Sequence, residues 1–450
     1  MRAHHHTLLL AMACAIAGPV KAQTATSIAN GLFYMPTTWS CFCIPTAAMD
    51  LTVAHTVTLN NDVLLGPGSI TINSGAALVQ DGTPRQLLMT GGAFTNQGNF
   101  VIDRMAVQGG TFTNTGAATI RAQSNYAMYT NSGTVGGMDT LFTEGSLTNS
   151  GQFTVGTVYT GGTFVTSGPV LGVDSLYNAG YLEVTATGVL DSDSLYNAVE
   201  LINSGTVQTV AFTNAGTWQN LGAAYADDLL NEGTFENHGT VQATGSMTNR
   251  LSFINHNTGT VDLAESFLNA NEALEPNAGE AVFTNNGQVD IGDSWYNFDQ
   301  IGGSSNGDWT VQDSTVNLGT MTGPFHFCDL TPPPAWPFVD YNLGTVGNDV
   351  VFCQGMGLMG RSSSPELLLR AHPVPATNDA QLWISLARGS TVRITLLDAL
   401  GAEVQLVHQG ALPAGEHRCT LSLHDLPPGG YTVRLIADDE QAAVRVAVVR

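Results

Sequence analysis

Positive charge is scarce in this chain. The only lysine is Lys21, and residues 23–360 contain four arginines against 28 acidic residues, a net charge of −24. Binding to a nucleic acid depends on basic groups that displace the counterions of the phosphates. The composition therefore argues against a nucleic acid as a partner of this region. Residues 361–450 differ, because eight arginines there nearly balance nine acids.

Long apolar runs are also lacking. After residue 22 no apolar stretch approaches the length of about 18 residues that a membrane-spanning helix requires, so we expect no membrane-spanning segment. Residues 1–22 have a basic residue near the start, an apolar run from Leu8 to Ala17, and small residues at Val20 and Ala22. This pattern is typical of a secretory signal peptide. A lipoprotein signal that uses Cys14 is the less favoured alternative, because this cysteine lies inside the apolar run.

Cysteine is rare, with six residues of which one lies within the signal peptide. Exported proteins can keep disulfides. Cys328 and Cys353 bracket a proline-rich segment, and a bond between them would close a loop of 26 residues, worth about 3 to 4 kcal/mol in the chain-entropy model. The alternative is a metal site that adds Cys41-x-Cys43 to this pair, but C-x-C is not the usual zinc spacing. We favour a disulfide or free thiols over a metal, and the pairing of Cys41, Cys43 and Cys419 stays open.

Signatures of common enzyme classes are missing. The sequence contains no P-loop and no dinucleotide-binding fingerprint, no Ser-His-Asp or Cys-His arrangement stands out, and His238 and His256 are isolated in turns. Lyases built on β-helices usually need a basic residue as base or charge neutraliser, and residues 23–450 contain no lysine. We predict no catalytic residue, no cofactor and no metal ligand.

One acidic phrase recurs. Asp174, Asp193 and Asp293 each stand four residues before an asparagine in D-S-L/W-Y-N, and Asp227 and Glu265 hold the same position. We expect these acids to form a partial stripe along one edge of the fold. A stripe that binds calcium or carbohydrate is one interpretation. The favoured interpretation is a row of solvated turn acids that keeps a strand-rich surface in solution, because the nonapeptide of calcium-binding β-rolls is absent.

Helical periodicity is absent, and a short phrase recurs instead. In the form apolar-x-Asn-x-Gly it returns at intervals of 17 to 20 residues over about 200 residues. Its asparagines are Asn96, Asn114, Asn131 and Asn149, and the series resumes at Asn197, Asn214, Asn231, Asn249 and Asn269. The glycines that follow two positions later include Gly98, Gly116, Gly133, Gly151 and Gly216. A fixed period of this size marks an internal repeat.

Each repeat has the length of one coil of a parallel β-helix. The segments around the asparagines are short and rich in Thr, Val, Phe and Ile, as strands are, whereas a propeller blade needs about 40 residues. Stacked coils place equivalent asparagines about 4.8 Å apart, within hydrogen-bonding reach. We expect Asn and Gly to supply left-handed conformations at the corners. We predict an all-β protein, a right-handed parallel β-helix solenoid of about 14 coils followed by a small C-terminal antiparallel β-sandwich.

The patterns divide the chain into six segments. A solenoid exposes strand edges at both ends, so each end needs a cap, and the aromatic residues Phe33, Tyr34 and Trp39 suit the first one. The segments are a signal peptide (1–22), an N-terminal cap (23–48), the β-helix repeats (49–325), a C-terminal cap with the disulfide (326–359), a linker (360–367) and the C-terminal domain (368–450).

The C-terminal domain contains an ordered set of motifs. They include Pro373 and Pro375 before "LWISL", Asp398 and Gly401 in "VRITLLDALGAEV", Gly415 in "LPAGEH", Leu426, Gly430 and Tyr431 in "LHDLPPGGYTVRL", and the terminal Arg450. This order resembles the type A C-terminal sorting domain of cargo proteins of the Bacteroidetes type IX secretion system. The chain departs from that pattern at Val374, where the family usually has Asn, and at Arg445, where Lys is common.

The resemblance implies a route and partners. A signal peptide carries such cargo through the inner membrane, and the sorting domain is recognised by the outer-membrane translocon. A sorting peptidase then usually removes the domain, as the cargo is anchored to surface lipopolysaccharide or released. The segments "TTWSCFCIP" and "CDLTPPP" also resemble parts of large Bacteroidetes surface proteins built on β-helices.

We therefore expect a non-enzymatic protein, adhesive or structural, that is secreted or held on the outer cell surface after passing through the periplasm. Surface lipopolysaccharide or glycans are its expected partners besides the secretion machinery. The alternative is a carbohydrate-active or carbohydrate-binding β-helix, which requires acids and aromatic residues that converge on one groove. A calcium-stabilised repeat would require paired carboxylates with open oxygen geometry.

Overall fold

The computed structural model describes residues 23–448 except 272–279, 331–338, 354–367, 373–375, 377, 387, 399–401, 425, 428 and 439. The expected signal peptide and linker lie outside the described residues. The chain forms two compact units, Met1–Cys353 and Gln354–Arg450. In the part of the chain that is described, no helix is long and apolar enough to cross a membrane.

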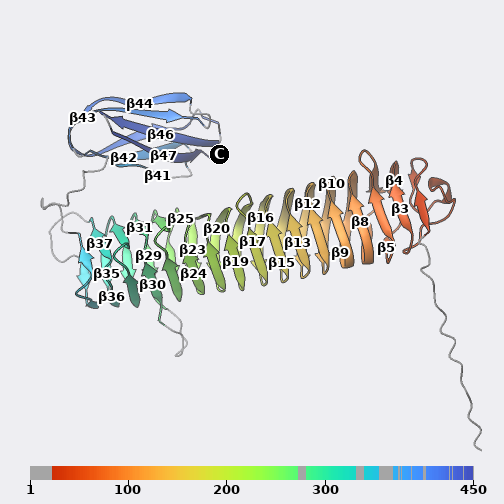
Figure 1. The fold of residues 1–450 in the computed structure, drawn as a ribbon, viewed down its shortest axis with the longest axis horizontal. Coiled ribbons are helices and arrows are strands. Elements are labelled where there is room, and N and C mark those ends of the chain that lie inside the picture. The colour runs from red at the N-terminus through yellow and green to blue at the C-terminus, as the bar shows by residue number, and fades with distance from the viewer. Residues whose placement is uncertain are drawn as a thin grey trace, which may run out of the picture. The chain divides into compact units, whose positions relative to one another are not determined.

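The first unit is a parallel β-helix whose strands stack side by side along a rod (Figure 1). Forty strands, from β1 (Thr24–Thr26) to β40 (Val351–Phe352), form one continuous sheet system in about 15 turns. Strands of neighbouring coils pair in parallel from the first pairing to the last. The predicted parallel β-helix is confirmed.

One coil in the middle of the rod contributes three short strands, which run along three faces and are separated by three corners. Buried and partly exposed residues alternate along each strand, so every second side chain points into the rod. Successive coils pair strand by strand. Thus β23 (Asp228–Asn231) pairs with β26 (Met247–Asn249), β24 (Thr234–Asn237) with β27 (Ser252–Asn255), and β25 (Thr240–Ala243) with β28 (Thr260–Leu263).

Equivalent side chains of successive coils stack inside the rod and form its core. The ring of Phe112 stacks on that of Tyr129 with centroids 4.7 Å apart, and Trp218 stacks on Phe235 at 3.8 Å. All four side chains are buried. Because a single coil cannot enclose its own apolar residues, each coil depends for its stability on its two neighbours.

The repeated asparagines form two separate columns at two corners of the coil. The first asparagine column, where the strand equivalent to β24 ends, contains Asn96, Asn114, Asn131, Asn149, Asn203, Asn220, Asn237, Asn255 and Asn285. The second asparagine column, where the strand equivalent to β23 ends, contains Asn125, Asn178, Asn197, Asn214, Asn231, Asn249, Asn269, Asn297, Asn317 and Asn342. Asn149 and Asn214 therefore belong to different columns, and the single interrupted series expected from the sequence is wrong.

Hydrogen bonds run along each column from coil to coil. Nδ2 of Asn131 donates to Oδ1 of Asn149 at 2.7 Å and to the carbonyl of Gln152 at 3.2 Å. Oδ1 of Asn131 accepts from Nδ2 of Asn114, also at 2.7 Å. The side chains are fully buried, so these bonds replace the water that the amides lose on folding. Thr166 takes an asparagine's place in the first column and accepts from Nδ2 of Asn149 at 3.0 Å.

A glycine stands two residues after many of the column asparagines and allows close approach of two coils. A Cβ atom on Gly116 would lie 2.2 Å from the carbonyl oxygen of Gly98 in the preceding coil, and one on Gly133 would lie 2.1 Å from that of Gly116. These glycines do not have positive φ, and among the described non-glycine residues only Phe42 and Asp438 have one. The left-handed conformation expected at the asparagine-glycine corners is therefore wrong, and close packing of backbones is the reason for glycine there. Left-handed glycines do occur at other corners of the rod, such as Gly137 and Gly172.

We expect Gly116→Ala to destabilise the rod by about 1 to 3 kcal/mol, because the added methyl group overlaps the backbone of the preceding coil. Gly136→Ala is the matched control, since no neighbouring atom lies within 4 Å of a Cβ placed there and its φ is not positive. Denaturant unfolding followed by circular dichroism compares the two variants. Equal unfolding midpoints would contradict the close-approach explanation.

The N-terminal end of the rod carries a small cap. It consists of β1, β2 (Gly31–Leu32) and the 3₁₀ helix η1 (Pro36–Thr38). Phe33 and Trp39 are buried there, and Nε1 of Trp39 donates to the Phe33 carbonyl at 2.7 Å. The apolar rings thus cover the interior of the first coil.

Four cysteines of the first unit form two disulfides. Cys41 is bonded to Cys43, and Cys328, in β37 (His326–Asp329), is bonded to Cys353. The Cα atoms of the two pairs are 5.1 and 4.9 Å apart, within the usual range for disulfides. Cys419 in the second unit is unpaired. Bonded sulfurs cannot act as thiolate ligands, so this arrangement disfavours the alternative Cys-based metal site.

The second unit consists of two antiparallel sheets that share one apolar core. Side chains from both sheets, such as Leu382 and Val433, are fully buried in it. The strands are β41 (Leu368–His372), β42 (Asp379–Leu386) and β45 (Gly415–Ser422) in one sheet, and β44 (Glu403–Leu412), β43 (Ser390–Leu397), β46 (Gly429–Ala437) and β47 (Glu440–Val448) in the other. The predicted small antiparallel domain is confirmed.

Candidate functional site

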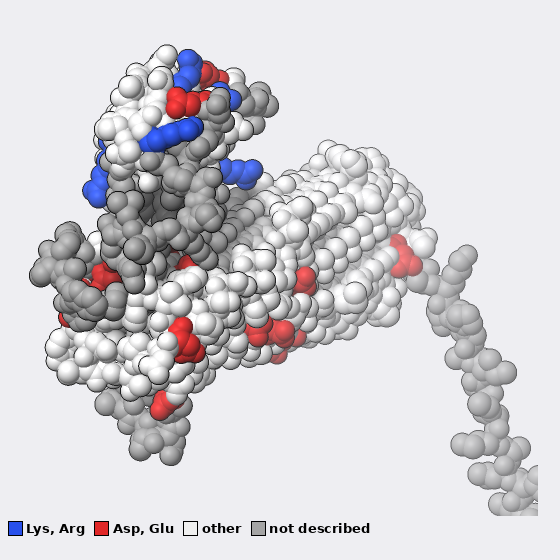
Figure 2. Space-filling view, turned by 60° about the vertical axis from the view of Figure 1, so that its left-hand side comes forward, with Lys and Arg blue, Asp and Glu red and all other residues white. Residues whose placement is uncertain are grey.

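The third corner of the coil, which lacks asparagine, carries the acidic phrase. Strand register places the following acids at equivalent positions: Asp139, Asp174, Asp193, Asp227, Glu265, Asp293 and Asp313. Gly156, Val210 and Gly245 interrupt the row. On the face shown in Figure 2, acidic side chains of the rod are separated by uncharged surface.

Hydroxyl groups of neighbouring residues engage several of these acids. Oγ1 of Thr244 donates to Asp227 at 2.6 Å, and Oγ of Ser266 donates to Asp293 at 3.0 Å. Within the described ranges, none of the row's carboxylates belongs to a group of three close side chains that could hold a metal ion. These contacts fit the interpretation of hydrogen-bonded turn acids better than that of paired carboxylates around calcium.

An arginine continues the acidic corner toward the N-terminus. Nε of Arg121 donates to Asp103 at 2.5 Å and Nη2 donates to its second oxygen at 3.0 Å, while Nη1 lies 3.4 Å from Asp139. The hydrogen bonds from Arg121 lower the pKa of Asp103, and Asp103 in turn raises the pKa of Arg121. The three side chains stand one coil apart, so this ion pairing joins three successive coils.

An outward-facing column of aromatic rings lies one position before the second asparagine column. Phe142, Tyr159, Tyr177 and Tyr196 stack with centroids 4.9 to 5.5 Å apart and planes within 5° of parallel. Each inner ring therefore has its faces occupied by its neighbours. A sugar ring stacks on an open aromatic face, so the inner rings Tyr159 and Tyr177 are not available for such stacking.

The first asparagine column is flanked by a cluster of Glu236, His238 and His256. Nε2 of His238 lies 4.0 Å from Oε2 of Glu236, and Nε2 of His256 lies 3.8 Å from the same oxygen. The two imidazole rings stack with centroids 3.7 Å apart and planes 9° from parallel. The three side chains are each about one-third exposed. Burial lowers the pKa of His238, and the adjacent His256 adds to this effect, although Glu236 acts in the opposite direction.

The sequence interpretation of His238 and His256 as isolated residues is wrong. Each histidine directly follows a column asparagine, and Asn237 pairs with Asn255 in register. The histidines are 18 residues apart, which is one coil, so the period itself could have placed them together. Glu236 carried no sequence signal of its own, because it is one of many acids in outward-facing strand positions.

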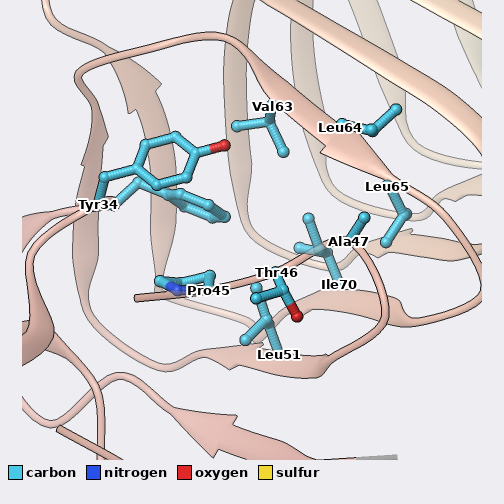
Figure 3. A pocket seen from close by; sticks show the side chains of 10 residues that line it. Tyr34, Pro45, Thr46, Ala47, Leu51, Val63, Leu64, Leu65 and Ile70 are labelled. Atoms are coloured by element: carbon cyan, nitrogen blue, oxygen red, sulfur yellow. The ribbon is translucent and has the colours of Figure 1, made fainter. Parts of the chain in front are cut away.

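A small apolar cavity of about 140 Å³ lies beneath the N-terminal cap. Figure 3 shows Tyr34 on one side of it and Val63, Leu65 and Ile70 on the other. The hydroxyl of Tyr34 donates to the carbonyl of Asp62 at 2.9 Å, which ties the cap to the rod. The lining carries no charged side chain, so the cavity offers packing space and no reactive group.

The motif residues of the C-terminal domain lie at turns and strand ends. Asp398 closes the connection between β43 and β44, because its Oδ1 accepts from the backbone N–H of Ala402 at 2.9 Å. Gly415 begins β45 with a φ of 123°, a conformation that favours glycine. The hydroxyl of Tyr431 in β46 donates to the carbonyl of Pro427 at 2.8 Å.

The remaining motif residues divide into described and undescribed positions. Leu426 packs against the core of the domain, and Gly430 lies in β46. Pro373, Pro375, Gly401 and Arg450 lie outside the described residues.

No protein-family model matches the chain, and no curated protein is significantly similar to it. The resemblance to sorting domains therefore rests on the motifs themselves.

Proposed function

We propose that the protein is a non-enzymatic β-helix of the cell surface or the extracellular medium, adhesive or structural, exported by the type IX secretion system through residues 368–450. The observation that carries the proposal is the division of the chain into a long solenoid and a small antiparallel domain with its own core. A sorting domain must be recognised and removed without disturbing the fold of the cargo. Two domains with separate cores allow one to be removed while the other stays folded.

The motif positions support the assignment of the smaller unit. Asp398, Gly415 and Tyr431 each stabilise a turn or strand end, so the motif order reflects one particular sandwich topology. The balanced charge of residues 361–450 also contrasts with the acidic rod. Among the described residues in Figure 2, arginine side chains are visible on this domain.

Fusion of residues 368–450 to a periplasmic reporter tests the export function. In a host that has this secretion system, the fusion is expected to reach the surface or the medium, while the reporter with its signal peptide alone stays in the periplasm. A reporter fused to residues 23–100 controls for addition of a foreign segment. Retention of the 368–450 fusion in the periplasm would refute the proposal.

The rod offers a long, repetitive surface, and this surface suits adhesion or a structural role. The second candidate, a carbohydrate-active or carbohydrate-binding β-helix, is favoured by one observation only, the row of acids at the third corner. A glycan array combined with a polysaccharide-degradation screen separates the two. Glycan binding without degradation fits an adhesin, and degradation would favour the second candidate.

A further inference from the structure

The cluster of Glu236, His238 and His256 brings together three side chains of the types that bind transition metals. Two imidazole nitrogens and one carboxylate oxygen lie within 4.8 Å of one another. Imidazole suits zinc, copper and nickel, and a set of two histidines and one glutamate is sufficient for zinc with a fourth position left to water. This cluster is the one place in the described residues where three such groups meet.

The backbone around the cluster is held firmly. The N–H of His238 donates to the carbonyl of Asn220, and that of His256 donates to the carbonyl of Asn237, both at 2.8 Å. The preceding asparagines, Asn237 and Asn255, are buried and hydrogen-bonded to each other at 2.9 Å. The two imidazoles are therefore fixed one coil apart, and only their side-chain torsions remain to be adjusted.

The distances are close to those of a bound ion. Two ligand atoms at the usual distances of about 2.0 to 2.2 Å from a tetrahedral zinc ion are about 3.4 Å apart. The observed separations from Glu236 of 3.8 and 4.0 Å exceed this by about 0.5 Å. An imidazole binds a metal in the plane of its ring, so the stacked rings must also tilt toward each other. Their partial exposure leaves room for that movement.

An unsatisfied nitrogen also points to a ligand. Nε2 of His256 is buried, and no described residue forms a hydrogen bond with it. A buried polar atom without a partner costs free energy, which a coordinated ion would recover.

We propose that Glu236, His238 and His256 bind a divalent transition-metal ion such as Zn²⁺, which clamps two neighbouring coils at the first asparagine column. Glu236 and His238 come from one coil and His256 comes from the next, so the ion bridges the seam between them. The proposal goes beyond the proposed export and surface function and does not depend on it.

Zinc titration of the full chain against a competing chromophoric chelator tests this site. His4, His5 and His6 are replaced by alanine in every sample, because this histidine run would bind zinc on its own. The chain is expected to bind one more zinc ion than its His256→Ala variant, or to bind it at least tenfold more tightly, equivalent to about 1.4 kcal/mol. Glu236→Gln, which keeps the side-chain shape, is expected to weaken binding in the same direction.

The matched control is His326→Ala. His326 lies in the same rod but pairs with Asp308 at 2.8 Å, outside the cluster, so its removal should leave zinc binding unchanged. Bound Co²⁺ should give a visible absorption band that is lost in His256→Ala and kept in His326→Ala. Circular dichroism confirms that each variant is folded. Equal zinc stoichiometry and affinity in the parent chain and a folded His256→Ala variant would overturn the proposal.

Discussion

Deletion of residues 368–450 is expected to leave a folded, β-rich protein that stays in the periplasm. The buried side chains of the rod and of the C-terminal domain form two clusters with no shared residue. Removal of the domain therefore creates no cavity in the rod and exposes none of its core. If the domain is the export signal, the truncated rod is folded but is not transported across the outer membrane.

Cell fractionation with a periplasmic marker and circular dichroism of the purified rod check the two halves of this prediction separately. The full-length chain, expressed in the same host, is the control for fractionation. Arrival of the truncated chain at the surface would contradict the assigned role of the domain. Failure of the truncated chain to fold would contradict the separation into two independent units.

Asn131→Ala is expected to destabilise the coils around it by about 2 to 4 kcal/mol. The substitution removes the acceptor of Asn114 and the donor to Asn149, both at 2.7 Å, together with a donor to the Gln152 carbonyl. These atoms lie where no water reaches them. Each unsatisfied buried group costs about 1 to 3 kcal/mol. Because Asn114 and Asn149 belong to the coils on either side, a single change at Asn131 destabilises both neighbouring coils.

Hydrogen exchange of the amides between residues 111 and 152 is the suitable measurement, because a long solenoid need not unfold in a single two-state step. Asn131→Thr is the matched control. Threonine already occupies column positions at Thr143, Thr160 and Thr166, and the hydroxyls of Thr143 and Thr166 accept from an asparagine at 3.0 Å. Threonine should therefore retain much of the protection that alanine loses. Equal protection in the Ala variant and the parent chain would show that the column contributes little.

The period of the repeat was sufficient to predict the coil, because each coil must present the same inward-facing residues to its neighbours. The period alone could not separate the two asparagine columns, since both corners use the same phrase. Asparagines six residues apart, such as Asn197 and Asn203 or Asn214 and Asn220, are the signal that two corners of one coil carry asparagine. The stretch after Asn149 is irregular because Thr166 and Val184 take the place of asparagine in the first column, while the second column continues through Thr160 and Asn178.

Two other features of the structure were not predicted from the sequence. Position 116 requires glycine because a carbonyl group of the preceding coil lies against it. This contact joins residues 18 apart in the sequence, so local turn propensities do not reveal it. The period relates the two histidines of the cluster, but the place of Glu236 beside them depends on which strand positions face outward and on how adjacent coils align. Both are consequences of register, which is set by the whole stack of coils and not by any one segment.

Asn255 and Asn285 are 30 residues apart, yet they occupy adjacent levels of the first asparagine column and hydrogen-bond at 2.9 Å. In the sequence the additional residues lie between β29 (Phe267–Asn269) and β30 (Val282–Asn285), and the strands on either side keep their pairing with neighbouring coils. Length variation is thus absorbed at corners, whereas a residue gained or lost within a strand would turn inward-facing side chains outward. The corners are the sites at which such a protein can acquire new loops, and with them new binding specificities, while its scaffold stays the same.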